Sequence, residues 1–144
     1  MLHIINTLED PLINYIKDDP VRPDIPVEWR VADNKQIFTL VDEHNKPQAI
    51  VCVAYCDSIP KSVDELLQES LKPENAIFYT IWSYSGGAGR QLILQVQSYL
   101  KNTCEHITRY VTLSPPTEMA KRFHLKNGAT IFRNNIETVN YEYK

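Results

Sequence analysis

Cysteine and glycine are both scarce in this sequence of 144 residues. The three cysteines, Cys52, Cys56 and Cys104, lack the spacing of a zinc site, so we expect free thiols and no bound metal. Cys52 and Cys56 lie in one strand-like segment at positions that share a face, and burial there is expected. Three of the four glycines stand in one short segment. That segment consists of Ser85, Gly86, Gly87, Ala88, Gly89 and Arg90.

The sequence also has no long apolar run and no excess of basic residues. No apolar run approaches the ~18 residues that a membrane-spanning helix requires. The start, Met1 to Asn6, lacks the basic residues and apolar core of a secretory signal. We therefore expect a cytoplasmic protein with no membrane partner. The net charge is −3 and the lysines and arginines are spread along the chain, so nucleic acid is not an expected partner.

The length and the hydrophobic content of 43% suit a single domain that spans residues 1–144. Helical spacing of apolar residues and capping residues predict helices at 7–19, 62–72, 88–101 and 117–127. The prolines at positions 20, 23 and 26 predict an extended segment, either a loop or an edge of the sheet. Alternation predicts strands, and the strand at 48–56 is apolar on both faces and should be central. The expected strands are 27–32, 36–42, 48–56, 75–82, 107–113, 130–133 and 137–143. This order predicts an α/β fold with a mixed sheet and helices packed on it.

The glycine segment lies between a predicted strand and a predicted helix. The first N–H groups of a helix have no intrahelical acceptor, and glycine lets a ligand approach the backbone closely. With the helix dipole and Arg90, these amides predict an anion site, most naturally for a phosphate or a diphosphate. The alternative is a turn that only reverses the chain. The spacing matches neither a P-loop nor the dinucleotide-binding fingerprint.

The element order, with a Gly-x-Gly helix entry after a central strand, resembles the GNAT acyltransferase superfamily. Residues 120–129, Ala-Lys-Arg-Phe-His-Leu-Lys-Asn-Gly-Ala, add to this resemblance. In that superfamily the glycine loop binds the diphosphate of acyl-CoA, and the sheet is mixed and mostly antiparallel. The resemblance therefore implies that residues 85–90 bind coenzyme A. Tyr84 stands where the superfamily has Arg or Gln, which leaves the backbone amides unchanged.

Four segments also resemble the catalytic domain of the malonyl-CoA decarboxylase family, and they occur in the family's order. They are residues 76–81 (Ala-Ile-Phe-Tyr-Thr-Ile), 112–115 (Thr-Leu-Ser-Pro), 123–129 (Phe-His-Leu-Lys-Asn-Gly-Ala) and 139–143 (Val-Asn-Tyr-Glu-Tyr). This resemblance covers residues 47–144. The sequence lacks the family's long insertion between the second and third segments and its acidic residue at the helix entry. We expect residues 1–45 to be no substitute for the family's large N-terminal helical domain.

The resemblance implies that Ser114 and His124 form a catalytic pair, with Tyr141 as a supporting hydrogen-bond donor. Decarboxylation of a malonyl thioester produces an enolate, so the site must orient the leaving carboxylate and protonate carbon. In this assignment Ser114 holds the carboxylate, and His124, with a pKa expected near neutral, supplies the proton. Taken separately, a serine before two prolines is more often a strand-end residue, and a lone histidine is more often structural.

Three functions share the expected coenzyme A site. The first is decarboxylation of malonyl-CoA to acetyl-CoA and CO2. The second is a GNAT-type transfer of acetyl from acetyl-CoA to a small amine or a protein acceptor, with His124, Tyr141 or Tyr143 as general acid or base. The third is a non-catalytic module that binds acyl-CoA. The sequence leaves all three open.

Overall fold

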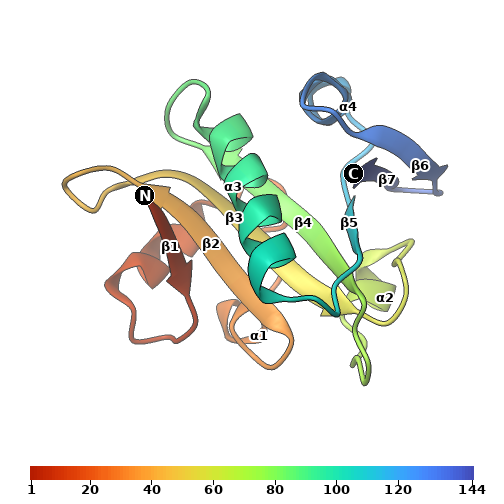
Figure 1. Ribbon diagram of the computed structural model, residues 1–144, viewed down its shortest axis with the longest axis horizontal. Coiled ribbons are helices and arrows are strands. Elements are labelled where there is room, and N and C mark those ends of the chain that lie inside the picture. The colour runs from red at the N-terminus through yellow and green to blue at the C-terminus, as the bar shows by residue number, and fades with distance from the viewer.

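A computed structural model describes the whole chain, residues 1–144, and contains one seven-stranded sheet (Figure 1). The strands lie in the order β1-β2-β3-β4-β5-β7-β6. All neighbouring strands are antiparallel except β4 and β5. The predicted mixed, mostly antiparallel sheet is therefore confirmed. The bounds are β1 (Leu2–Ile5), β2 (Lys35–Val41), β3 (Pro47–Cys56), β4 (Asn75–Ser83), β5 (Arg109–Thr112), β6 (Thr130–Asn134) and β7 (Val139–Tyr143).

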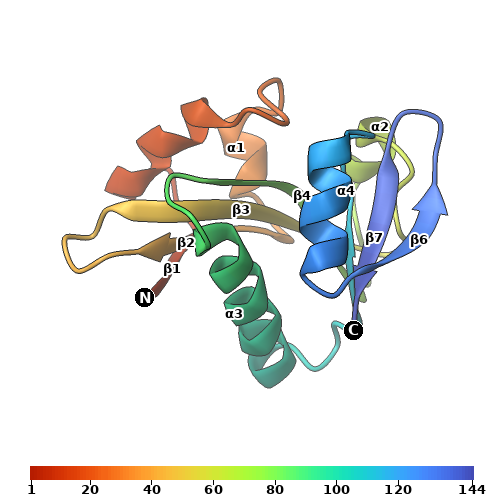
Figure 2. The same ribbon diagram turned by 90° about the horizontal axis from the view of Figure 1, so that it is seen from above.

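Helices cover both faces of the sheet (Figure 2). One face packs against α3 (Ala88–Thr103), whose apolar stripe includes Leu92, Ile93 and Val96. The other face is covered by residues of the N-terminal third of the chain and by α2. None of the helices is long and apolar enough to cross a membrane. The remaining helices are the 3₁₀ helix η1 (Pro11–Asp18), α1 (Val27–Arg30), α2 (Val63–Leu66) and α4 (Glu118–Lys126).

The strand β3 lies in the middle of the buried part of the sheet, between β2 and β4. Ile50 and Cys52 belong to the core on one face, and Val51 and Val53 belong to the core under α3. A strand that is covered on both faces needs apolar residues at successive positions, which is the pattern of this segment. Cys52 and Cys56 are buried free thiols on one face, as predicted.

The prediction of a strand over residues 27–32 is wrong, because Val27–Arg30 forms α1. The apolar side chains of Val27, Trp29 and Val31 alternate as in a strand, and all three pack, partly buried, against one core. Arg30 enters a buried ion pair, and that tertiary contact overrides the local pattern. The strand β1 was not predicted; its four residues pair with β2 at the edge of the sheet.

The helix predicted at residues 62–72 is also too long. α2 ends at Leu66, and Leu71, which was expected on its apolar face, is 89% exposed. The predicted capping residue is confirmed, since Ser62 Oγ accepts a hydrogen bond from the Glu65 N–H. The Glu65 carboxylate accepts from the Lys61 N–H instead of closing back on Ser62.

The parallel strands β4 and β5 separate partway along β4. They pair from Asn75 opposite Arg109 to Phe78 opposite Thr112. The last backbone hydrogen bond runs from the Leu113 N–H to the Phe78 carbonyl, at 3.0 Å. Beyond that point β4 continues to Ser83 without β5 beside it. This separation positions the candidate site.

Candidate active site

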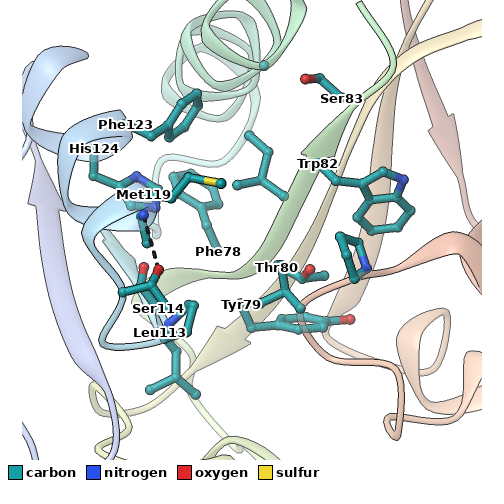
Figure 3. A pocket seen from close by; sticks show the side chains of 17 residues that line it. Phe78, Tyr79, Thr80, Trp82, Ser83, Leu113, Ser114, Met119, Phe123 and His124 are labelled. Carbon is teal, nitrogen blue, oxygen red and sulfur yellow. Dashed lines mark hydrogen bonds between the residues drawn. The ribbon is translucent and has the colours of Figure 1, made fainter.

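A cleft of about 370 Å³ lies where β4 and β5 separate (Figure 3). Its walls come from the second half of β4, from the residues after β5, from α4 and from Pro20 and Val21. No Lys, Arg, Asp or Glu side chain lines it, and Gly89 at the start of α3 lies at one boundary. Ser114 and His124 both line the cleft, and Figure 3 shows them on one side of it, opposite Trp82.

Ser114 follows the end of β5 and is only 4% exposed. Its backbone forms an isolated bridge with Val139, which fixes the residue against β7. The hydroxyl donates a hydrogen bond to Thr112 Oγ1 at 2.7 Å, and that oxygen also accepts from the Tyr141 N–H. The seryl oxygen can still accept a hydrogen bond through its lone pairs. Within the chain it makes no hydrogen bond to a basic group.

His124 lies on α4, which Thr117 caps by accepting from the Ala120 N–H. The imidazole is 4% exposed, and burial lowers its pKa from 6.5 to about 4. The expectation of a near-neutral pKa is therefore wrong, because no acidic group compensates for the lost hydration. At neutral pH the ring is uncharged.

The Tyr143 hydroxyl lies 2.6 Å from Nδ1 of His124. A phenol is a better donor than acceptor and an imidazole nitrogen lone pair is a good acceptor, so the hydroxyl donates to Nδ1. The imidazole then carries its hydrogen on Nε2, since its only hydrogen bond within the chain is the one at Nδ1. Burial raises the pKa of Tyr143, so its hydroxyl stays protonated. The sequence analysis named both residues as candidate acids or bases, but no sequence pattern indicated that they pair, since one lies on α4 and the other on β7.

Tyr141 does not line the cleft. Its ring stacks on the His124 imidazole, with centroids 5.1 Å apart and planes at 27°. The structure thus brings Ser114 and His124 to one cleft and puts Tyr141 behind the histidine, where it holds the orientation of the ring.

Acid is expected to destabilise the fold through His124. In the unfolded chain the histidine protonates as the pH falls through 6.5, whereas in the folded chain it stays neutral until about pH 4. Stability that is fully present above pH 6.5 is therefore lost toward pH 4, by about 3 kcal/mol. Urea unfolding at pH 7 and pH 4 measures this loss. The His124→Gln variant should lose less than the wild type, and the exposed His106→Gln should behave like the wild type; equal losses in all three would contradict the assignment.

The glycine segment forms the junction between β4 and α3 that the sequence predicts. Gly87 is the N-cap of α3 with φ of 79°, and no side chain caps the helix. The N–H groups of Gly86, Gly87, Gly89 and Arg90 donate no hydrogen bond within the chain. Four free donors beside a helix N-terminus can hold a diphosphate.

The side chains around these amides have partners elsewhere. Ser85 Oγ donates to Gln48 Oε1 at 2.9 Å, which ties the loop to β3. Ala88 is buried, and Arg90 donates from Nη1 to Asn127 Oδ1 at 3.2 Å, at the end of α4. No side chain therefore fills the space in front of Gly86 and Gly87, where a Cβ would have no neighbour within 4 Å.

Gly89 brings α3 and α4 together. A Cβ built on Gly89 would lie 3.2 Å from Cε1 of Phe123, which is tighter than ordinary side-chain contact. Phe123 precedes His124 and lines the cleft. The absence of a side chain at Gly89 thus allows the amide-rich loop and the histidine helix to share one wall.

Replacing Gly87 with alanine is expected to lower the free energy of unfolding by about 1 kcal/mol, because a left-handed φ strains a residue with a Cβ. Denaturant unfolding measures the change. Gly86→Ala is the matched control, since Gly86 has no positive φ and open space around it; it should cost less than about 0.5 kcal/mol. Equal costs at both positions would refute the backbone argument.

No cluster of three or more His, Cys, Asp or Glu side chains could hold a metal ion.

The separated parallel strands, the amide-rich entry to α3 and the cleft between them define a GNAT-like fold. GCN5 of Tetrahymena matches with a TM-score of 0.67 over 99% of this chain and 94% of that one, at 12% identity. The PaiA N-acetyltransferase of Thermoplasma acidophilum, solved in complex with coenzyme A, matches with a TM-score of 0.62 over 100% and 99%, at 12% identity.

Malonyl-CoA decarboxylase from Agrobacterium vitis matches with a higher TM-score, 0.86, over 100% of this chain at 20% identity. The chain spans 60% of the length of that protein. Neither a protein-family model nor a curated protein matches the sequence. The structural resemblance to malonyl-CoA decarboxylase is thus confirmed, and it extends over the first 46 residues, beyond the segments on which the sequence resemblance rested.

Proposed function

We propose that this chain binds an acyl-CoA and decarboxylates a malonyl thioester to acetyl-CoA and CO2. The observation that supports this proposal is that Ser114 and His124 both line one cleft, which has no charged side chain in its walls and borders the free amides of α3. The fold is shared with malonyl-CoA decarboxylase and with acetyltransferases, one of which was solved with coenzyme A.

The diphosphate of coenzyme A fits the amides of Gly86, Gly87, Gly89 and Arg90. These donors are free, and the space before Gly86 and Gly87 is open. Ser85 and Ala88 shape the loop, one through its bond to Gln48 and the other through burial. From this loop the cleft continues past Gly89 to Ser114 and His124, so a thioester arm entering there has a route to both side chains.

The reacting end of the cleft suits the loss of a carboxylate. A carboxylate in a cleft without charged side chains is poorly solvated, whereas CO2 is neutral, so the environment favours the product. In the proposed step the Ser114 hydroxyl turns from Thr112 Oγ1 and donates its hydrogen bond to the carboxylate, which orients it. The bond between the α-carbon and the carboxyl carbon breaks, and its electron pair remains on the α-carbon as an enolate.

Protonation follows from the neutral His124 and its partner. The Nε2 proton of His124 moves to the α-carbon while the Tyr143 hydroxyl proton moves to Nδ1, so the imidazole stays neutral in its pocket. The phenolate of Tyr143 then regains a proton from water, which its raised pKa makes favourable. Tyr141 supports the imidazole by stacking.

Acetyl transfer to an amine is the second candidate. It is favoured by the full-length match to acetyltransferases, since 99% of the Thermoplasma enzyme is covered against 60% of the decarboxylase. Removing a proton from an ammonium acceptor needs a base, however, and His124 with a pKa of about 4 is a weak one. The cleft also offers no carboxylate to bind an ammonium group.

The deciding experiment incubates the protein with malonyl-CoA in D2O and follows the products by NMR. The proposal expects acetyl-CoA with one deuterium in its methyl group, released with CO2 and without an acceptor. Acetyl-CoA with a panel of amines is the parallel assay, and thiol release there without decarboxylation would favour acetyl transfer. Saturable binding of coenzyme A with no product in either assay would leave a binding module and overturn the catalytic proposal.

A further inference from the structure

An arginine side chain, Arg22, bridges the backbones of β4 and of the segment after β5 where the two strands separate. In a continued parallel ladder the Leu113 carbonyl, next after the last β4–β5 bond, would accept a hydrogen bond from a backbone N–H of β4. Here the Leu113 carbonyl accepts from Arg22 Nη2 at 2.9 Å instead. Arg22 comes from the proline-rich segment before α1, far from both strands in sequence.

The same guanidinium reaches the other strand. Arg22 Nε donates to the Tyr79 carbonyl at 3.4 Å. Tyr79 is the extra residue of a bulge, because Phe78 and Thr80 pair with the adjacent residues Val53 and Cys52 and leave Tyr79 without a partner. One planar group therefore satisfies a carbonyl on each side of the gap at the point where the strands part.

Arg22 is held in place from behind. Asp19 Oδ1 accepts from the Arg22 N–H at 3.0 Å and from the Thr80 hydroxyl at 2.8 Å, which fixes the segment to β4. Arg30, itself 1% exposed, donates from Nη2 to the Arg22 carbonyl and from Nη1 to Asp19 Oδ2, both at 2.7 Å. Pro20 and Val21, which precede Arg22, form part of the cleft wall.

We propose that Arg22 is a positioning residue that keeps the inner end of the cleft open for the acyl group. It does not line the cleft and acts through the backbones of Tyr79 and Leu113, the latter adjacent to Ser114. This proposal rests on the proposed function for the identity of the ligand. Arg22 thus affects the acyl part of an acyl-CoA and leaves the diphosphate part, bound at α3, unaffected.

The test compares the dissociation constants of free coenzyme A and acetyl-CoA by calorimetry. Arg22→Met, which can bridge neither carbonyl, should leave the affinity for coenzyme A within about twofold and weaken acetyl-CoA by about tenfold. Arg22→Lys, which can reach one carbonyl, should fall between. Arg109→Met is the matched control, since Arg109 pairs with Glu142 at the surface, and it should change neither constant. An unchanged acetyl-CoA affinity in Arg22→Met would overturn the proposal.

Thermal melting and crystal structures distinguish a failure of the positioning role from misfolding and from a failure of the proposed function. If Arg22→Met does not fold, Arg22→Lys carries the comparison, with thermal melting as the check on folding. If the wild type binds neither ligand, the proposed function fails and the acyl role falls with it. Crystal structures of the wild type and Arg22→Lys then decide the positioning claim: a changed separation between the Tyr79 and Leu113 carbonyls supports it, and an unchanged one refutes it.

Discussion

Replacing Arg30 with methionine is expected to lower the free energy of unfolding by about 3–5 kcal/mol, because it leaves a buried carboxylate without its cation. Asp19 and Arg30 form an ion pair at 2.7 Å with both side chains 1% exposed. Arg30 also donates to the carbonyls of Ile25 and Arg22, which would lose their donors. The loss is measured by urea unfolding at pH 7.

The matched controls compare the buried Asp19–Arg30 ion pair with a partly exposed ion pair. Arg109→Met breaks a pair with 39% and 25% exposed side chains and should cost less than about 1 kcal/mol. The double variant Asp19→Asn with Arg30→Met removes both charges, so its cost should be smaller than the sum of the single costs. A cost below about 1 kcal/mol for Arg30→Met alone would show that Asp19 is satisfied by its other donors.

Replacing His124 with alanine is expected to lower the rate of malonyl-CoA decarboxylation by at least about 100-fold, the usual contribution of a positioned proton donor. The affinity for coenzyme A should stay within about twofold, since the free amides of α3 do not depend on His124. The rate is measured from acetyl-CoA formation, and the affinity by calorimetry.

His106→Ala is the control for the histidine variant, because His106 is exposed in the turn after α3. It should match the wild type in both measurements. Unchanged decarboxylation in His124→Ala would remove the histidine from the mechanism, and loss of coenzyme A binding in that variant would show that the substitution disturbs the fold instead.

The elements that the sequence predicted are those with strong local patterns. Apolar residues follow one another along β3 and β4, as in buried strands, and recur at helical spacing in α3. Gly87 and Thr117 mark the starts of α3 and α4. Residues 27–32 were predicted as a strand because apolar residues alternate there, whereas Val27–Arg30 forms α1. In the folded chain the position of Arg30 is decided by Asp19, a contact that no local pattern encodes.

In the candidate site, too, features with a local sequence pattern could be predicted and features that depend on tertiary contacts could not. The glycine segment could be predicted because a strand, free amides and a helix follow one another along the chain. Ser114 and His124 were selected through a family resemblance, which named residues without their environment. The neutral state of His124 and its bond to Tyr143 depend on burial between α4 and β7, and the role of Arg22 depends on where two strands separate. Such properties arise only in the assembled structure.

The close approach of Gly89 to Phe123 places two structural constraints on position 89. A side chain there would push against Phe123, on the helix that carries His124, and the Gly89 N–H is itself one of the amides proposed for the diphosphate. The proposed diphosphate site and the position of the His124 helix therefore both depend on Gly89. A relative with a larger residue at this position would need compensating changes both in the proposed diphosphate loop and in α4.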